Sequence, residues 1–254
     1  MLDRILAAAR QRAEALPAER ELRARAADAP PVRDFRAALS GPGLSVIAEI
    51  KRRSPSRGDL DPDLDPAGLA VAYQEGGASA LSVLTEPLFF SGSDSDLARA
   101  RAACDLPVLR KDFTLVPAQV WEARAIGADA VLLIVAALDD PTLRRLLETA
   151  EEAGLAALVE IHDEEEAERA VEAGALLVGV NNRDLRTFTV DLAVAEKLAP
   201  ALVDVPTKVA ESGIGGPDDA RRMAVAGYDA VLVGEWLVTQ GDPRSHIAAI
   251  RGER

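Results

Sequence analysis

The chain has 254 residues, of which 48% are hydrophobic, and can bury a large core in one α/β barrel or in two smaller domains. Its formal net charge of −13 argues against nucleic-acid binding as the main task. No apolar run is long enough for a membrane span, and the charges close to Met1 differ from a secretory signal. One cysteine, Cys104, excludes an internal disulfide framework and fits the reducing cytoplasm. Two distant histidines, His162 and His246, make no zinc constellation, so we expect no metal.

The N-terminal residues 1–43 predict a helical extension ahead of the first strand. Residues 3–26 are rich in alanine, arginine, glutamate and leucine, with an interruption at Pro17, and residues 35–39 predict a further short helix. This segment could cover the mouth of the fold as a lid or close its other end as a plug. Its alanine-rich faces favour neither alternative.

From residue 44 onward one pattern recurs, in which an amphipathic segment is followed by a glycine and then by a continuous apolar run. A glycine at this place is typical of the left-handed residue that ends a helix. An unbroken apolar run is typical of a strand that is buried on both faces. The pattern therefore predicts βα units around a parallel sheet. It gives the strands 80–84, 130–135, 156–161, 176–180 and 230–233, and three further strands, at 46–50, 108–111 and 208–210, bring the number to eight.

Eight such units predict a (β/α)8 TIM barrel over residues 44–254 that forms a single domain with its N-terminal helical extension. A doubly wound open sheet is the structural alternative. That fold usually carries a glycine-rich first turn, and no G-x-G-x-x-G follows a predicted strand here.

Charged and polar residues collect at the carboxyl ends of the predicted strands. These ends meet at one mouth of a barrel, where barrel enzymes keep their active sites, so we expect one functional site there. Period-two geometry places Glu49 and Lys51 on the same face of the first strand, and their opposite signs reduce the cost of burying charge. Further candidates at this mouth are Arg110, Lys111, Glu160, His162, Asn181, Arg183 and Glu211.

Two glycine-containing loops predict a phosphate site. Ser212 and Gly213 follow the seventh strand, and Gly234 and Glu235 follow the eighth. Beside glycines, backbone N–H groups can approach an anion closely, and these two loops form the usual phosphate site of the fold. Tight turns alone would also explain the glycines.

Motifs spread over all eight predicted strands carry a resemblance to one family. The most specific is Glu49-Ile50-Lys51 followed by Ser54-Pro55-Ser56. The others are Leu84-Thr85-Glu86 with Phe90, Leu109-Arg110-Lys111-Asp112-Phe113, residues 127–134, Val159-Glu160-Ile161-His162, and residues 179–185, 209–214 and 231–235. On these motifs, which cover nearly the whole chain in order, the sequence resembles the indole-3-glycerol phosphate synthase family.

The resemblance implies a cytoplasmic lyase of tryptophan biosynthesis that closes a ring without a cofactor. Its substrate would be 1-(2-carboxyphenylamino)-1-deoxyribulose 5-phosphate, whose ring carbon attacks the sugar ketone before CO₂ and water leave. Lys111 would be the general acid on the ketone oxygen, Glu160 the acid or base of the dehydration, and Lys51 with Glu49 would position the substrate. Ser54, Phe90, Phe113, Asn181, Arg183 and Glu211 would bind the substrate, and Ser212, Gly213, Gly234 and Glu235 would hold its phosphate.

Several alternatives stay open at this stage. Either Lys111 or Lys51 could be the acid, and we expect the nearby cations Arg110 and Lys51 to lower the pKa of Lys111. Phe90 and Phe113 could flank the substrate ring or only pack their loops. A sister barrel such as phosphoribosylanthranilate isomerase would share the phosphate site, and a catalytically inactive barrel could be a metabolite sensor or a scaffold. The oligomeric state is open, with a monomer favoured.

Overall fold

A computed structural model describes residues 2–55, 57–185, 187–239 and 241–252. Within these residues eight parallel strands close into a barrel, which confirms the predicted (β/α)8 fold. The strands follow the chain around the barrel, and β1 closes it by pairing with both β4 and β10. The predicted strand ends are correct to within one residue. The barrel strands are β1 (Ser45–Ile50), β4 (Ala80–Leu84), β5 (Val108–Lys111), β6 (Ala130–Ile134), β7 (Ala156–Ile161), β8 (Leu177–Asn181), β9 (Thr207–Glu211) and β10 (Ala230–Val233).

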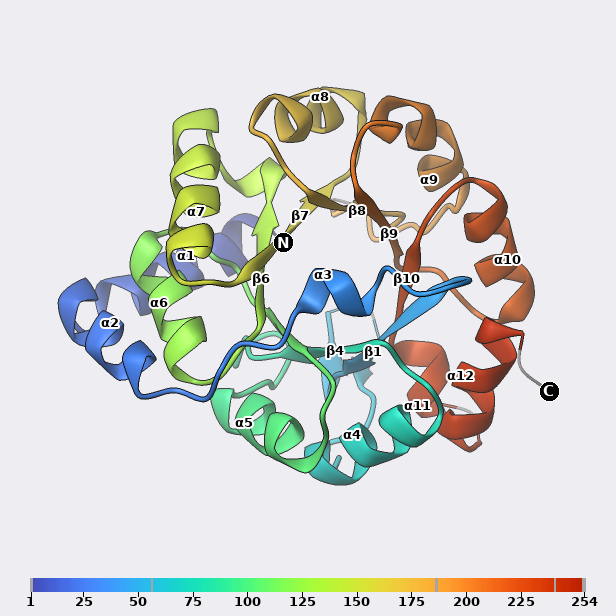
Figure 1. Cartoon of the computed structure of the whole chain (residues 1–254), viewed down its shortest axis with the longest axis horizontal. Coiled ribbons are helices and arrows are strands. Elements are labelled where there is room, and N and C mark those ends of the chain that lie inside the picture. Colours follow the sequence, from blue (N-terminus) through green and yellow to red (C-terminus); the bar gives the residue numbers. More distant parts are fainter. Residues whose placement is uncertain (1, 56, 186, 240, 253–254) are drawn as a thin grey trace.

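Helices cover the outside of the barrel (Figure 1). Their ends follow local sequence signals: Asp139 accepts a hydrogen bond from the Thr142 backbone N–H at the start of α7, and Gly127 adopts φ 93° after α6. The outer helices are α4 (Pro66–Glu75), α5 (Asp94–Ala103), α6 (Pro117–Ala125), α7 (Asp140–Glu152), α8 (Glu164–Glu172), α9 (Ala193–Leu198), α10 (Pro217–Val225), α11 (Glu235–Thr239) and α12 (Pro243–Arg251). Short 3₁₀ turns η1 (Val135–Ala137) and η2 (Ala199–Leu202) follow β6 and α9, and a small ribbon of β2 (Arg53–Ser54) and β3 (Gly58–Asp59) follows β1.

Alternation along the strands divides the barrel interior into two zones. Toward the amino ends of the strands the inward side chains are apolar and buried, among them Ile47, Leu109 and Leu158. Two residues further along the same strands, on the same faces, come Glu49, Lys111 and Glu160, which line the cavity at the carboxyl ends of the strands. The apolar half is therefore a packed floor beneath a polar mouth.

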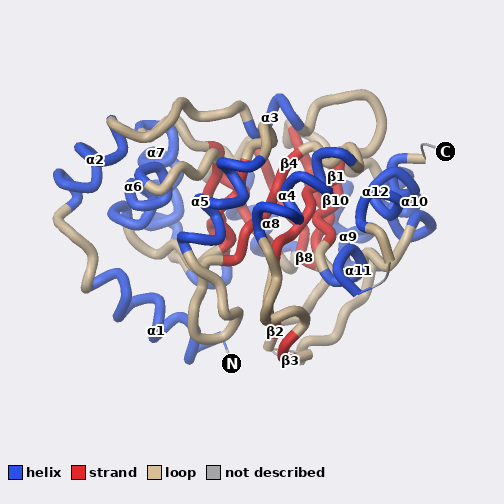
Figure 2. Tube along the Cα trace, turned by 90° about the horizontal axis from the view of Figure 1, so that it is seen from below, coloured by secondary structure: helices blue, strands red, loops and turns tan. Residues whose placement is uncertain are grey.

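The N-terminal extension both caps the mouth and plugs the floor. In α1 (Leu2–Glu14), Leu2 and Ile5 reach the mouth, whereas α2 (Glu19–Ala27) packs against α6 on the outside. In α3 (Phe35–Ala38), Phe35 is buried with Leu39 against the apolar floor. Figure 2 shows α1 near the β2–β3 ribbon and α3 at the opposite end of the barrel. The lid and the plug are thus two parts of one segment.

Asp129, at the amino end of β6, secures the floor. Its buried carboxylate accepts hydrogen bonds from the backbone N–H groups of Val108 and Arg33, both at 2.8 Å, and pairs with Arg101 at 3.1 Å. Because a buried carboxylate is costly without partners, this arrangement fixes the segment that leads into α3 against β5 and β6.

Candidate active site at the barrel mouth

The carboxyl ends of the strands surround a cavity of about 550 Å³, a volume that suits a small molecule. The described chain places on its wall every residue that the resemblance assigns to the site, although these come from loops and strands spread over nearly two hundred positions, whereas the further candidates Arg110 and His162 do not line the cavity. The roles assigned to them stay predictions. The predicted residues on this wall are Glu49, Lys51, Ser54, Phe90, Lys111, Phe113, Glu160, Asn181, Arg183, Glu211, Ser212, Gly213, Gly234 and Glu235.

Lys111, the last residue of β5, lies between two buried glutamates. Its ammonium donates hydrogen bonds to Glu160, at 3.1 Å, and to Glu211. Burial alone would lower the pKa of Lys111, but the charges of Glu211, Glu160 and Glu49 outweigh burial and raise that pKa above its ordinary value. Lys111 is therefore fully protonated at neutral pH.

The expectation that Arg110 and Lys51 lower the pKa of Lys111 is wrong, because that pKa is raised and the Lys51 charge is paired with Glu49. Adjacent residues of a strand point to opposite faces, so Arg110 turns away from the barrel interior. Its guanidinium binds Glu122 at 2.7 Å and Asp94 at 3.1 Å, among the outer helices. The mouth therefore presents carboxylates rather than cations to Lys111.

Glu160 and Glu211 both bind Lys111, but their pKa values are shifted in opposite directions. Burial would raise the pKa of Glu160, yet Lys111, His162 and Asn181 together lower it below its ordinary range. Burial raises the pKa of Glu211 to about 7, because the neighbouring charges of Glu160 and Glu49 offset the attraction of Lys111. At neutral pH Glu160 is ionised, whereas Glu211 readily takes up a proton.

Gly179 in β8 makes room for Glu211. A Cβ atom at Gly179 would collide with Oε1 of Glu211, and one at Gly234 would collide with the Glu49 carboxylate. Both carboxylates therefore depend on a glycine of a neighbouring strand or loop. Gly234 is a predicted phosphate-binding residue, whereas Gly179 belongs to a family motif without a predicted role of its own.

His162 supports Glu160 from behind and does not line the cavity. Its Nδ1 lies 3.0 Å from Oε2 of Glu166, which also accepts the His162 backbone N–H at 2.8 Å. Its Nε2 lies 3.3 Å from Oε1 of Glu160. Burial would lower the pKa of His162, but these two carboxylates raise it to about 10.

The raised pKa of His162 predicts a pH dependence of stability. A proton held more tightly in the folded state stabilises fully below the unfolded pKa of about 6.5 and ceases to do so as pH rises through about 10. The free energy of unfolding should therefore fall by at most about 1.4 kcal/mol per pH unit across this window. Urea unfolding at pH 7 and pH 10 checks this. His162→Gln should lose less stability over the same interval, and an equal loss in both proteins would contradict the assignment.

The Glu49–Lys51 pair lies side by side at the end of β1. The Lys51 ammonium donates a hydrogen bond to Glu49, which is buried, and the Tyr73 hydroxyl donates to the Glu49 carbonyl oxygen at 3.1 Å. The predicted period-two geometry is thereby confirmed. Both charged groups face the cavity, and each reduces the cost of burying the other.

Asn181 and Arg183 form the wall after β8. The Asn181 amide donates to Oε1 of Glu160 at 3.1 Å, and its carbonyl oxygen accepts the Arg183 backbone N–H at 3.0 Å. The Arg183 guanidinium donates to the carbonyl oxygen of Phe188 at 3.2 Å. Asn181 thus orients Glu160 and the start of the Arg183 loop together.

The loops after β9 and β10 lie on the same wall. Ser212 and Gly213 both have positive φ, 63° and 82°, and a Cβ at Gly213 would collide with Val190. A left-handed serine costs of order 1–3 kcal/mol, and such strain clusters at ligand sites. Across the mouth, Arg57 pairs with Glu235 at 2.7 Å. Ser54 also lines the cavity, whereas Ser56 of the same motif lies outside the described residues.

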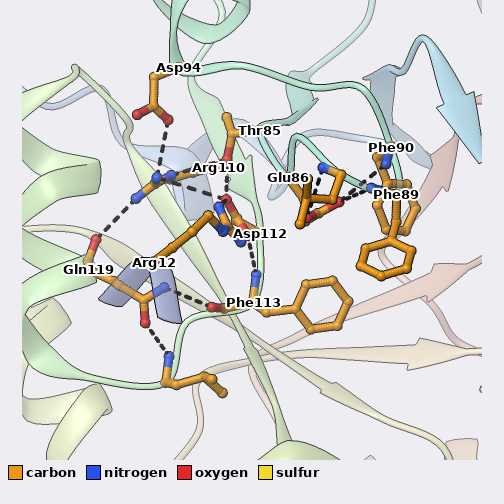
Figure 3. A network of polar contacts seen from close by, with 12 residues as sticks. Arg12, Thr85, Glu86, Phe89, Phe90, Asp94, Arg110, Asp112, Phe113 and Gln119 are labelled. Atoms are coloured by element: carbon orange, nitrogen blue, oxygen red, sulfur yellow. Dashed lines mark hydrogen bonds and ion pairs between the residues drawn. The ribbon is translucent and has the colours of Figure 1, made fainter. Parts of the chain in front are cut away.

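Two phenylalanines form an aromatic edge of the cavity (Figure 3). The rings of Phe90 and Phe113 are 6.5 Å apart and inclined by 38°. Glu86 holds the Phe90 loop by accepting backbone N–H groups, including that of Phe89 at 2.7 Å, and Gln119 donates to the Phe113 carbonyl oxygen at 3.0 Å. Both rings are therefore held by buried polar contacts in their loops.

Arg12 fastens α1 to this edge. Its guanidinium binds both oxygens of Asp112, at 3.0 and 2.7 Å, beside the Thr85 hydroxyl and Arg110 (Figure 3). Burial would raise the pKa of Asp112, but Arg12, Arg110 and Thr85 lower it. The bidentate pair joins residues one hundred positions apart and lies directly after Lys111.

Arg12→Met should loosen α1 and uncover the mouth. Asp112 would lose two charge-assisted hydrogen bonds, at an expected cost of about 1–3 kcal/mol in the free energy of unfolding. Because Leu2 and Ile5 line the cavity, KM should rise more than kcat falls. Urea unfolding and steady-state kinetics check both effects. Arg10→Met, on the exposed face of the same helix, is the matched control, and identical behaviour of the two variants would exclude this role.

The fold and the mouth together define a class of protein. A closed (β/α)8 barrel with a buried ammonium and buried carboxylates at the carboxyl ends of its strands is typical of an enzyme and has the groups that acid–base chemistry needs. No helix in the described part of the chain is long and apolar enough to cross a membrane.

Comparison with known proteins identifies the family. The family model described as indole-3-glycerol phosphate synthase matches residues 2–250. The indole-3-glycerol phosphate synthase of Mycolicibacterium smegmatis is 58% identical over 228 residues, covering 90% of this chain and 84% of the relative. That of Streptomyces griseus is 57% identical over 228 residues, covering 90% and 85%. The chain belongs to the indole-3-glycerol phosphate synthase family, a group of carboxy-lyases that act on a phosphorylated small molecule in tryptophan biosynthesis.

More distant solved structures share only the fold. A 3-hexulose-6-phosphate synthase aligns with a TM-score of 0.64 at 19% identity, covering 82% of this chain and 99% of its own. A thiamine phosphate pyrophosphorylase from Pyrococcus furiosus aligns with a TM-score of 0.60 at 21% identity, covering 82% and 94%.

Proposed function

We propose that Lys111 is the general acid of the ring closure and that Glu160 transfers the protons of the dehydration. The chain converts 1-(2-carboxyphenylamino)-1-deoxyribulose 5-phosphate to indole-3-glycerol phosphate. The ring carbon that bears the carboxylate forms a bond to the ketone carbon, and the ketone oxygen takes the proton of Lys111. Loss of CO₂ then returns its electron pair to the ring. The new hydroxyl finally takes a proton and leaves as water, the adjacent ring carbon loses its proton to the Glu160 carboxylate, and the indole double bond forms.

One observation carries these roles: the Lys111 ammonium lies at the cavity wall between Glu160 and Glu211. Because its pKa is raised, the ammonium stays charged and can stabilise the negative charge that develops on the ketone oxygen. Glu160 is ionised and lies 3.1 Å from Lys111, so it can take up the proton that the substrate carbon releases in the dehydration and pass it to Lys111. Glu211 completes the network on the other side.

Lys51 and Arg183 would hold the carboxylate and hydroxyl groups of the substrate. Both line the cavity, where Glu49 orients Lys51 and Asn181 orients the Arg183 backbone. A guanidinium is suited to grip a carboxylate with two parallel hydrogen bonds. Phe90 and Phe113 would pack against the two sides of the anthranilate ring.

The substrate phosphate would lie at the loops after β9 and β10. Ser212, Gly213, Gly234 and Glu235 share one wall there, and Ser54 lines the same cavity. The left-handed backbone at Ser212 and Gly213 supports this role, because it keeps bulky side chains away from an approaching anion.

Turnover of the purified chain tests the proposed function. With no added cofactor and with EDTA present, the carboxyphenylamino substrate should give indole absorbance and an equimolar amount of CO₂. The dephosphorylated substrate should react with kcat/KM lower by about a hundredfold or more, because the binding energy of the phosphate is lost. Equal kcat/KM for both substrates would contradict the phosphate site, and rearrangement without CO₂ would contradict the ring closure.

We also propose that the chain acts as a cytoplasmic monomer in which residues 1–43 and 44–254 form one domain. Two features support this: α1 and Phe35 close both ends of the barrel, and Cys104 is a buried thiol without a disulfide. Sedimentation at two protein concentrations tests the oligomeric state.

A further inference from the structure

The two glutamates at Lys111 are nearly equivalent apart from one neighbour. Both are at least 98% buried, both come from the ends of barrel strands, and both bind the same ammonium. His162 contacts only Glu160, with Nε2 lying 3.3 Å from Oε1. Glu211 has no such contact among the described residues, and its Oε1 atom is buried without a hydrogen-bond partner there.

A second carboxylate fixes the His162 ring. Glu166, in the first turn of α8, lies 3.0 Å from Nδ1 and also accepts the backbone N–H of His162 at 2.8 Å. The backbone N–H of Glu166 in turn donates to the Asp163 side chain at the helix start, at 2.9 Å. The ring is thus held with Nε2 at 3.3 Å from Oε1 of Glu160, within ion-pair distance although outside hydrogen-bond geometry. Carboxylate, imidazole and carboxylate form a line that ends at the cavity wall.

We propose that His162, oriented by Glu166, is a positioning residue that decides which of the two glutamates at Lys111 keeps the negative charge during the reaction. This inference rests on the proposed roles of Lys111 and Glu160. When Lys111 gives its proton to the ketone oxygen, both glutamates lose their shared cation. The imidazolium of His162 then remains beside Glu160 alone. Glu160 therefore stays an ionised base, while Glu211 accepts a proton more readily.

Two carboxylates among the described residues are the main charges that act on His162. Glu160 from β7 and Glu166 from α8 are the charged groups that act on the ring, and Lys111 lies beyond Glu160. The turn η1, which packs against both β7 and α8, contains only Val135, Ala136 and Ala137. Asn181 reaches Glu160 as a neutral amide. Protonation of His162 therefore depends on its two carboxylates.

The pH profile of kcat tests the proposal through His162→Gln, whose amide cannot carry a charge. In this variant the acidic limb of the profile, where the base of the bound complex is protonated, should move to higher pH by about one unit or more, because Glu160 loses a neighbouring positive charge. KM should stay within about twofold, because His162 does not line the cavity. An unchanged limb in a folded variant would overturn the proposal.

Glu166→Gln is a second, milder variant, which leaves the ring in place and should shift the limb in the same direction by a smaller amount. Glu165→Gln removes an exposed charge from the same helical turn and should leave the profile unchanged. If His162→Gln fails to fold, NMR titration of the unaltered chain, which has only two histidines, measures the protonation of the His162 ring and tests the proposal instead. A His162 ring that is neutral at pH 7 would overturn the proposal, and one that stays protonated to about pH 10 supports it.

The Glu160→Gln variant separates a failure of the proposed function from a failure of the His162 proposal. If Glu160→Gln keeps near-normal turnover, the role of Glu160 is wrong and the His162 proposal falls with it. If Glu160→Gln is inactive while both His162→Gln and Glu166→Gln keep the parental pH profile, only the His162 proposal fails.

Discussion

Lys111→Met is expected to lower kcat about 10²- to 10⁴-fold, the usual contribution of a positioned general acid. Methionine nearly fills the volume of lysine but carries no proton, so the ketone oxygen would develop its charge without a donor. The loss should fall on kcat rather than on KM, because Lys51 and Arg183 still line the cavity. Steady-state kinetics measured by indole absorbance gives both constants.

The same variant also removes the cation from two buried carboxylates. Breaking a buried ion pair by deleting one partner costs about 3–5 kcal/mol, so the variant should be assayed well below its unfolding midpoint. Lys197→Met, at an exposed lysine paired with Glu164, is the matched control and should retain parental kcat. If Lys111→Met keeps near-normal kcat while Lys51→Met abolishes it, the roles of the two lysines are reversed.

Glu160→Gln is expected to produce a loss of similar size, about 10²- to 10⁴-fold in kcat. The amide keeps the shape of the side chain and can still accept a hydrogen bond from Asn181, but it cannot take up or return a proton. The parental chain should show a bell-shaped pH profile, and the variant should lose the limb that belongs to Glu160. Rapid-quench analysis should show the intermediate between ring closure and dehydration.

A parental pH profile in Glu160→Gln would remove this residue from its assigned role. Glu165→Gln again supplies the control for a lost carboxylate, since that side chain is exposed on α8. Glu211→Gln distinguishes the two glutamates: it should slow the reaction less than Glu160→Gln if Glu160 is the base.

Much of the barrel and its mouth follows from short-range rules. Unbroken apolar runs after glycines predict five of the strands to within one residue, and closure of the barrel then brings the strand ends together. Period-two alternation places Glu49 and Lys51 inside, and the structure confirms this. The same rule, applied to Arg110 beside Lys111, would have placed Arg110 outside. The expected influence of Arg110 on the pKa of Lys111 neglected this alternation.

Contacts between distant segments have no comparable signal in one sequence. Nothing local to Arg12 indicates that it binds Asp112, one hundred residues away, so the extension could be predicted as a helix but not docked. His162 and Glu166 have the four-residue spacing of a helical contact. Their function depends, however, on the direction of the His162 ring toward Glu160, which only the folded chain defines.

A crystal structure of the chain with a substrate analogue whose ketone is reduced to an alcohol tests the central claim most directly. We expect Nζ of Lys111 within hydrogen-bond distance of that alcohol, the phosphate at Ser212, Gly213 and Gly234, and the aromatic ring between Phe90 and Phe113. An analogue bound with its alcohol at Lys51, or with its phosphate away from the loops after β9 and β10, would contradict the account.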